Sequence, residues 1–509
     1  MSNSKHTPES IELTSRPPFP APALNVTPAA TTPDLPEAGL ANNSSEPNPS
    51  LLHPVDGGFH AWAFLGASFL IEAIVWGFPD AFGVFLDAYL TDPAYTSHPH
   101  ASSLLPLIGP IASGIVYCVA PFLSPLINRY PNYRRTAMYV GLLLCWASLF
   151  AASYTTNVVI LLALQGVVYA FGAALLYFPS LSYLAEWFIN LRGFANGVLF
   201  AGTGVGGVVL PLTISKLLSM YGPNVTVRIL SVGIVVLLLP LMPFVKGRIP
   251  VGHVAGHVQP VSRGSSNSVK SWMGSYFFWM LLVANTIQSF AYFVPILWLP
   301  TFASTLNLDS TTSSATLAMF HTGSVIGRLT MGYLSDSSLK QCFILASSTL
   351  LATSVTIFVL WGVFSTNLAG LFSFCIIYGL LAGGWPSLWS GFGKGLTLND
   401  PTLSMTLFGI LLFTRGIGNI ASTPLSAALT GFSSASPTTS FSTNSSSSSS
   451  QMSAKLGFNI AGGRFASTIL YAGTCFAGAG MIVLFGWGRE VYYHHRHRQS
   501  AGAASENVM

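Results

Sequence analysis

Long apolar runs recur along the chain and are separated by short polar segments. A run of about 20 apolar residues is long enough to cross the hydrocarbon core of a bilayer as an α-helix. Twelve such runs lie near residues 59–86, 102–127, 135–154, 157–187, 192–219, 225–245, 273–303, 312–334, 341–361, 366–394, 402–432 and 463–488. The pattern predicts an all-α membrane protein with twelve transmembrane helices, here called spans 1 to 12.

The polar segments divide this series into two halves. Segment 246–272 is the longest polar gap within the first ten spans, and it leaves six spans on each side. Residues 1–50 are rich in Pro, Ser, Thr and Asn and lack an apolar run, which is typical of disorder and not of a signal peptide. The predicted organisation is a disordered cytoplasmic tail (1–55), a six-helix half (56–246), a cytoplasmic central loop (247–271), a second six-helix half (272–490) with a Ser-rich outer loop (433–460), and a cytoplasmic tail (491–509).

Three motifs recur six spans apart, as expected of two parallel repeats. They are Pro79 and Pro295 in spans 1 and 7, Phe178-Pro-Ser-Leu181 and Trp385-Pro-Ser-Leu388 in spans 4 and 10, and Gly204-Val-Gly-Gly207 and Gly416-Ile-Gly-Asn419 in spans 5 and 11. Tyr169 and Tyr378 precede the second pair of motifs. Prolines inside spans kink the helices, and kinked helices can line a central cavity.

The composition excludes several classes of protein. The chain is 51% hydrophobic and only 7% charged, whereas soluble domains carry about 25% charged residues. The net charge of +5 is not gathered on a folded basic face, which argues against nucleic-acid binding. The five cysteines are scattered singly, and no nucleophile–base pair or metal set lies at a membrane surface. We therefore expect no enzymatic activity, cofactor or metal site.

The basic residues predict the orientation in the membrane. Of the 21 Lys and Arg residues, fifteen fall in segments that are cytoplasmic if the N-terminus is inside, four fall in outer segments or at the outer ends of spans, and two, Arg328 and Arg415, lie deep within spans. The positive-inside rule then places both termini in the cytoplasm. With this orientation, Asn444 in the Ser-rich outer loop is the best glycosylation candidate, and Asn224, close to the membrane surface, is a weaker one.

Four charged residues lie inside spans, namely Glu72, Asp80, Arg328 and Arg415. A charge within the bilayer is costly, and none of the four has an opposite charge within one turn of its own helix. Each must find a partner on another helix, face water, or lose its charge. Both an ion pair between helices and a role in solute binding or proton coupling are open. Asp80 is the best proton-carrier candidate, and His321, two turns before Arg328, is a weaker one.

The glycine-rich stretch of span 5 has two interpretations. Gly202-Thr-Gly-Val-Gly-Gly207 matches the glycine spacing of dinucleotide sites, but such sites require a preceding strand and this stretch lies inside a helical span. Small residues at this spacing instead let helices pack closely. Among the aromatic residues of the proline-containing spans, Tyr292 and Trp385 are the candidates for contact with a solute.

Five motifs together carry a family resemblance. They are Val55-Asp-Gly-Gly-Phe-His-Ala-Trp62 before span 1, Asn128-Arg129-Tyr130 after span 2, Ala185-Glu-Trp-Phe-Ile-Asn-Leu-Arg-Gly-Phe-Ala-Asn-Gly197 leading into span 5, Gly327-Arg-Leu-Thr-Met-Gly-Tyr-Leu-Ser-Asp336 at the end of span 8, and Arg415-Gly-Ile-Gly-Asn419 in span 11. In these motifs the chain resembles the major facilitator superfamily, and within it the fungal monocarboxylate-transporter-like branch. The resemblance covers roughly residues 55–490.

The resemblance implies alternating access by rocking of two halves, often driven by a proton gradient. It implies gating roles for the residues that match the family motifs, namely Glu186, Arg192, Asn196, Gly197, Asn128, Arg129 and Asp336. It also implies that Arg328 pairs with the substrate or a nearby acid. The animal lactate carriers have a lysine where this chain has Asp80 and an acid where it has Ser324. We therefore expect Asp80 to pair with Arg328 across the cavity.

The sequence thus predicts a secondary transporter that moves a small organic acid, as its anion, or a related metabolite, in symport with protons, across the plasma membrane. Arg328 and Arg415 would attract the anion, Asp80 would exchange the proton, and His321, Tyr292, Trp385 and Asn419 would belong to the same pathway. The expected partners are the solute, protons and the lipid bilayer, and no nucleic acid. Two alternatives stay open: an exporter of a fungal secondary metabolite, and a non-transporting nutrient sensor, against which the short C-terminal tail argues.

Overall fold

A computed structural model describes residues 53–249, 274–306, 308, 310–336, 339–397, 401–430 and 456–506. All of these residues belong to one compact unit, Leu52–Met509. Most of the predicted N-terminal tail, the central loop and the Ser-rich loop, including Asn444, lies outside the described residues. Every regular element among the described residues is a helix, which confirms the predicted fold class.

The first bundle comprises the helices between Phe59 and Leu241. Their bounds are α1 Phe59–Thr91, α2 Pro93–Thr96, α3 Ala101–Leu104, η2 Leu105–Leu107, α4 Ile108–Cys118, α5 Ala120–Arg129, η3 Pro131–Tyr133, α6 Arg134–Ala152, α7 Val158–Leu161, η4 Leu162–Val168, α8 Tyr169–Trp187, α9 Arg192–Leu238 and η5 Leu239–Leu241.

The second bundle comprises the helices from Tyr276 onward. Their bounds are α12 Tyr276–Thr305, α13 Ser310–Ser335, α14 Leu339–Thr356, η6 Ile357–Phe364, α15 Leu368–Gly383, α16 Trp385–Thr397, α17 Pro401–Leu429, η8 Gly457–Gly463 and α18 Ala466–Glu506. Helix α18 continues well beyond the predicted end of span 12 at residue 488.

Each of the twelve predicted spans corresponds to helical structure. Among the described residues, ten helices are long and apolar enough to cross a membrane. One of them, Arg192–Leu241, contains both span 5 and span 6. Gly222, with φ 74° and ψ 175°, interrupts this helix between the two spans, and Pro223 follows it. Span 8 is α13, whose polar first turns, beginning Ser-Thr-Thr-Ser-Ser, lower its hydropathy.

The proline kinks of spans 1 and 7 have matching tyrosine partners, which supports the predicted repeat. Pro79 removes the helical hydrogen bond to the carbonyl of Val75, four residues earlier. The hydroxyl of Tyr169 on α8 donates to this carbonyl at 2.8 Å. The hydroxyl of Tyr378 on α15 likewise donates at 2.8 Å to the carbonyl of Tyr292, just before Pro295. The tyrosines that precede the repeated Pro-Ser-Leu motifs therefore satisfy backbone groups beside the kinks.

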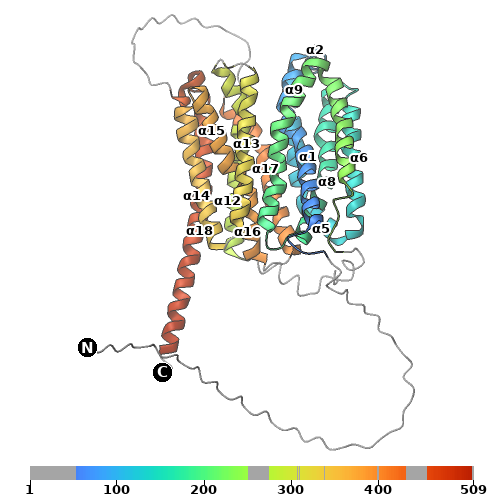
Figure 1. Cartoon of the computed structure of the whole chain (residues 1–509). Helices are drawn as coiled ribbons and strands as arrows, with labels where there is room; N and C mark the ends of the chain where they lie inside the picture. The colour runs from blue at the N-terminus through green and yellow to red at the C-terminus, as the bar shows by residue number, and fades with distance from the viewer. Residues whose placement is uncertain are drawn as a thin grey trace, which may run out of the picture. The chain divides into compact units, whose positions relative to one another are not determined.

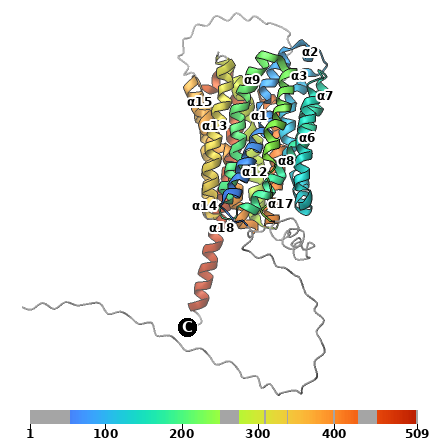
Figure 2. The ribbon, with the colours of Figure 1, turned by 45° about the vertical axis from the view of Figure 1, so that its right-hand side comes forward.

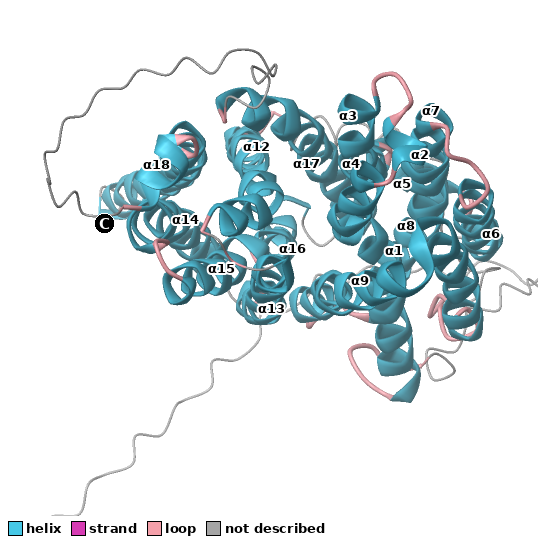
Figure 3. Cartoon of the chain, turned by 90° about the horizontal axis from the view of Figure 1, so that it is seen from above, coloured by secondary structure: helices cyan, strands magenta, loops and turns pink. Residues whose placement is uncertain are grey.

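The two bundles lie side by side and meet along four helix pairs. Figure 1 shows the blue-to-green helices on one side and the yellow-to-red helices on the other, and in the turned view of Figure 2 the two sets partly overlap. In the view of Figure 3, α9 lies against α13, and α17 lies against α4. Helix α17 also contacts α5, and α16 contacts α9. A site between the bundles would therefore be enclosed by helices from both halves of the chain.

Glycines allow α9 to approach helices on two sides. A Cβ atom on Gly206 would lie 2.1 Å from the carbonyl oxygen of Ala73 on α1. On the other side, a Cβ atom on Gly197 would lie 2.5 Å from the carbonyl oxygen of Arg328 on α13. These distances are too short for any side chain, so the close-packing interpretation of the glycine-rich stretch is confirmed.

Candidate functional site

Side chains from both bundles enclose a cavity where the bundles meet. The lining comprises Glu72, Trp76, Tyr117, Tyr177, Phe200 and Thr203 from the first bundle, and Arg328, Pro386, Trp389, Leu412 and Arg415 from the second. The volume open to the centre of a water molecule is about 20 Å³, and roughly 10–15 Å³ by this measure suffices for one water. In this state the cavity has room for a water molecule but not for a larger solute.

Arg328 on α13 reaches across to the first bundle. Its side chain is 7% exposed. Its Nη1 donates to the carbonyl of Phe200 on α9, and its Nε donates at 3.3 Å to the carbonyl of Gly383 on α15. These acceptors are neutral carbonyl groups, so the guanidinium is hydrogen-bonded but its charge is not neutralised.

The acid that shares the cavity with Arg328 is Glu72, not the residue predicted from the sequence. Glu72 is buried on α1, and its Oε1 accepts a hydrogen bond from the hydroxyl of Thr203 at 3.1 Å. Glu72 and Arg328 line the same cavity and interact electrostatically. The expected ion pair between Asp80 and Arg328 is absent among the described contacts, although Asp80 interacts electrostatically with both Arg328 and Arg415.

The physical reason lies in the position of the two acids along α1. Glu72, Trp76 and Asp80 follow at intervals of four residues and share one face of the helix. Glu72 and Trp76 lie level with the cavity, whereas Asp80 lies one turn farther along, next to the Pro79 kink, and does not line it. The contact between Asp80 and Arg328 predicted from the sequence is therefore wrong for this conformation.

Arg415 on α17 is the second cation of the cavity and is only 2% exposed. Its Nη1 donates at 3.3 Å to the side-chain carbonyl of Gln288. Its guanidinium carbon lies 4.2 Å from the ring centroid of Tyr292, a cation–π contact. Its Nε has no hydrogen-bond partner among the described residues. Tyr292 thus supports Arg415 and does not line the cavity itself.

The remaining predicted pathway residues lie around the cavity. The ring of His321 packs on Gly207, and its Nδ1 has no hydrogen-bond partner among the described residues. The indole N–H of Trp385 donates to the side chain of Asn285 at 2.8 Å, and Trp389, one turn later, lines the cavity instead. Asn419 donates at 2.6 Å to Ser113 and so joins α17 to α4.

A second polar contact between the bundles lies at the N-terminus of α9, the end predicted to be cytoplasmic. The carboxylate of Asp336 accepts hydrogen bonds from the backbone N–H groups of Gly193 and Phe194, both at 2.8 Å. One turn further, the side chain of Asn196 donates to Ser390 at 2.8 Å. An anion is stabilised at the positive end of a helix dipole, so Asp336 holds the two bundles together here.

A second carboxylate organises the same segment from within the first bundle. Asp56 accepts hydrogen bonds from the backbone N–H groups of Ile189, Asn190 and Leu191 at 2.9, 3.0 and 3.1 Å. The acid of the motif before span 1 thus orders the turn in front of Arg192. The Nε of Arg192 is buried and has no hydrogen-bond partner among the described residues.

The other motif residues form contacts within the first bundle. Glu186 pairs with Arg134 at 2.5 Å, an ion pair with side chains 13% and 7% exposed. Asn128 accepts a hydrogen bond from Ser182 at 3.0 Å, and Arg129 is exposed. Arg134 and Glu186 are 52 residues apart, so no local pattern in the sequence indicates this pair.

Two further predictions concern modification and metals. The side-chain oxygen of Asn224 accepts a hydrogen bond from the hydroxyl of Tyr95 at 2.6 Å, so this amide is already engaged, and its glycosylation stays a prediction. Among the described residues, no group of three His, Cys, Asp or Glu side chains is placed to hold a metal ion.

Several site residues gave little signal in the sequence. Four residues of the cavity lining lie in apolar runs, namely Trp76, Tyr117, Tyr177 and Thr203. The spacing of residues in these runs does not show whether a side chain faces a cavity, the lipid or the protein core. Glu72 was visible as a charge within a span, but its position relative to Arg328 depends on how two distant helices are rotated. Asp56 lies within the motif before span 1, and that motif was the only signal for it.

The chain is similar to known membrane transporters. Residues 63–423 match the family model of the Major Facilitator Superfamily. The chain is 24% identical over 283 residues to "MFS-type transporter pytF" of Aspergillus terreus, which covers 56% of this chain and 92% of the relative. It is 27% identical over 361 residues to "MFS-type transporter hasB" of Aspergillus fumigatus, which covers 69% of this chain and 77% of the relative. It is 25% identical over 359 residues to "Monocarboxylate transporter 10" of Danio rerio, covering 68% of each.

Two solved structures share the fold. The transporter FucP in the outward conformation aligns with a TM-score of 0.55 at 15% identity, covering 83% of this chain and 98% of FucP. The human organic anion transporter MFSD10 aligns with a TM-score of 0.52 at 14% identity, covering 84% of this chain and 97% of MFSD10. At these identities the likeness concerns the fold alone.

Proposed function

The chain belongs to the major facilitator superfamily, and from this premise we propose that it is a secondary active transporter of a small organic anion. The proposal goes beyond membrane transport as such by naming the charge of the solute. It rests on the chemistry of the cavity between the two bundles.

The observation that carries the proposal is the pair of buried arginines that line this cavity. Neither Arg328 nor Arg415 forms an ion pair with a described carboxylate. Their described hydrogen-bond partners are backbone carbonyls and one side-chain amide. A guanidinium inside a membrane protein is costly and usually marks a pathway. Held by neutral groups, these two cations keep their charge for an anion, which they can bind through charge-assisted hydrogen bonds.

The way the cavity is built supports alternating access as the mechanism. Each bundle supplies part of the lining, so separation of the bundles at one end opens the cavity to one side of the membrane. The Asp336 contact closes the end predicted to be cytoplasmic, and release of that contact would open it. Close glycine packing between α9 and α13 allows the two surfaces to meet and part as rigid units.

Proton coupling is the second part of the proposal. Acidic side chains within spans commonly carry protons in transporters. Asp80 exchanges the proton in this scheme, because it interacts electrostatically with both cavity arginines and is free of an ion pair to a described residue. A proton taken up there would leave the arginines more strongly positive toward an incoming anion.

The same cavity serves either direction of transport. The two Aspergillus relatives are named as MFS-type transporters, without a printed substrate. Uptake of an organic acid and export of an acidic metabolite would use the same cavity. They would differ only in the direction of the solute and proton gradients across the membrane. The plasma membrane is part of the proposal, and the distribution of the basic residues supports an orientation with both termini in the cytoplasm.

Uptake of radiolabelled organic acids into proteoliposomes tests the proposal. Arg328→Ala is expected to lower uptake by at least about tenfold, since a hydrogen bond to a charged group contributes roughly 1.5–3 kcal/mol. Arg135→Ala is the matched control, because Arg135 is exposed at the start of α6, and this variant should transport normally. Unchanged uptake by Arg328→Ala would remove the central argument.

The coupling is tested with an imposed pH gradient. Asp80→Asn should abolish uphill accumulation while exchange of labelled for unlabelled solute continues, because exchange needs no net proton movement. Accumulation that follows the pH gradient in Asp80→Asn would show that another group carries the proton.

A further inference from the structure

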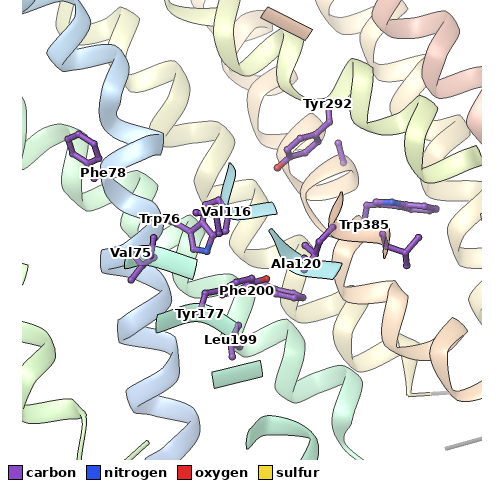
Figure 4. Close-up of a cluster of buried hydrophobic side chains, with 14 of the residues drawn as sticks. Val75, Trp76, Phe78, Val116, Ala120, Tyr177, Leu199, Phe200, Tyr292 and Trp385 are labelled. Atoms are coloured by element: carbon purple, nitrogen blue, oxygen red, sulfur yellow. The ribbon is translucent and has the colours of Figure 1, made fainter. Parts of the chain in front are cut away.

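The two bundles contribute different chemistry to the cavity. The first bundle supplies four of its aromatic rings, Trp76, Tyr117, Tyr177 and Phe200. Figure 4 shows Trp76, Tyr177 and Phe200 gathered together, with Tyr292 and Trp385 on helices of the other bundle. The second bundle supplies both cations. The first bundle thus supplies most of the aromatic rings, here called the aromatic wall, and the second bundle supplies the two arginines and Trp389, here called the cationic wall.

Three rings of the aromatic wall, Trp76, Tyr117 and Tyr177, contact one another. The rings of Trp76 and Tyr117 lie 4.6 Å apart with an interplanar angle of 30°. The ring of Tyr177 meets Trp76 edge to face at 5.7 Å. Aromatic rings prefer offset-stacked and edge-to-face neighbours at these separations. A planar ring of a ligand could continue this arrangement.

The cationic wall has donors that lack acceptors. The Nε of Arg415 and the indole N–H of Trp389 are buried, and neither has a hydrogen-bond partner among the described residues. The carboxylate on the cavity, Glu72, already accepts a hydrogen bond from Thr203 on the opposite side. A buried donor without an acceptor is costly, so such groups are usually explained by a partner that binds there. A carboxylate supplies several acceptor sites at once.

We propose that the transported anion is an aryl carboxylate, whose ring packs on the first bundle and whose carboxylate binds Arg415 and Trp389 of the second. This inference rests on the proposed function and specifies its substrate class. The cavity is too small for such a ligand in the closed state, so binding occurs after the bundles separate. The ligand then bridges the aromatic wall and the cationic wall as they close again.

Isothermal titration calorimetry on the purified full-length protein tests the ring requirement. The probes are benzoate and 2-naphthoate, their saturated counterparts cyclohexanecarboxylate and decahydro-2-naphthoate, and the uncharged 2-naphthalenemethanol. Each aromatic pair contributes about 0.5–1.5 kcal/mol beyond area burial, so two ring contacts correspond to about tenfold. The aryl acids are expected to bind at least about tenfold tighter than their saturated counterparts and than the alcohol.

Three variants separate the ring from the charge. Tyr177→Leu should remove most of the preference for aryl over saturated acids, whereas Tyr177→Phe keeps the ring and should retain that preference. Arg415→Gln should weaken both kinds of acid and leave the alcohol unaffected. The ratio of two affinities on one protein sample is insensitive to the fraction that is folded.

The outcomes distinguish the two proposals. Equal affinity for aryl and saturated acids, with both lost in Arg415→Gln, would overturn the aryl inference and leave organic-anion transport standing. Tight binding of the uncharged alcohol with no binding of any acid would overturn both. Absence of binding by all five probes would also count against both, since the panel includes the chemistry that each proposal requires.

Discussion

The carboxylate of Asp336 accepts a hydrogen bond from the backbone N–H of Gly193 at 2.8 Å and so joins the two bundles at the start of α9. The same carboxylate accepts from the N–H of Phe194 at 2.8 Å. These donors are among the first N–H groups of the helix, which lack intrahelical acceptors. Asp336 therefore acts as a helix cap supplied by the opposite bundle, and its loss affects closure of one end of the cavity more than the folding of either bundle.

Asp336→Asn should shift the protein toward the state that is open at this end. Loss of a charged group at a helix N-terminus costs roughly 1 kcal/mol. This corresponds to about a fivefold change in the ratio of the open to the closed state. Spin labels at Arg135 and Gln341, exposed on different bundles, can report the change by double electron–electron resonance after the native cysteines are replaced.

The expected result is a larger fraction of long distances in Asp336→Asn. Asp87→Asn is the control, because Asp87 is exposed near the other end of α1 and should leave the distribution unchanged. An Asp336→Asn distribution identical to wild type would show that this cap does not hold the closed state.

Gly197→Ala should impair closure because α9 and α13 could no longer meet. The added Cβ would lie 2.5 Å from the carbonyl oxygen of Arg328, a backbone atom that cannot move aside independently. Transport should fall by about tenfold in proteoliposomes, since one or two kcal/mol of strain suffices for such a change. Gly83→Ala is the matched control, since no atom lies within 4 Å of its added Cβ, and it should transport within about twofold of wild type. Wild-type rates in Gly197→Ala would contradict a functional role for the close approach.

Glu72→Gln should bind the anion more tightly. The amide oxygen can still accept from Thr203, while the negative charge that ionised Glu72 places on the lining of the cavity shared with Arg328 is removed. A negative charge on the lining of the cavity opposes an incoming anion, so we expect an increase of about tenfold in the affinity for an organic acid. Calorimetry measures this, with an uncharged ligand as the control that should not respond. Weaker binding of the acid would indicate that Glu72 itself contacts the solute.

Arg134 and Glu186 should show a coupling in a double-mutant cycle of thermal stability. Their ion pair is 2.5 Å long and nearly buried. Removing one partner leaves an uncompensated charge and costs on the order of 3 kcal/mol. Arg134→Ala should therefore lower the melting temperature by several degrees, and adding Glu186→Gln should restore part of the loss. Additive effects of the two changes would mean that the pair contributes nothing to stability.

The sequence by itself determined the fold class, the helical segments and the duplicated motifs. Lipid requires every spanning segment to be apolar and to satisfy its own backbone, so spans are visible as local patterns. The predicted boundary between span 5 and the span at 225–245 is correct, because Gly222 interrupts the helix there and Pro223 follows it. Gly202 to Gly207 likewise indicated close packing locally, since glycine is the residue that close helix approach requires.

Only the tertiary structure decided which side chains meet. Span 1 contains both Glu72 and Asp80 on one face, and nothing in their spacing shows which of them is level with Arg328. Trp385 and Trp389 also lie one turn apart, and the choice between them depends on Asn285, a hydrogen-bond partner 100 residues away from Trp385. The height and rotation of a helix are fixed by the sum of its contacts with several distant helices. The local period of the sequence therefore identifies the candidates, and the packing of the two bundles selects among them.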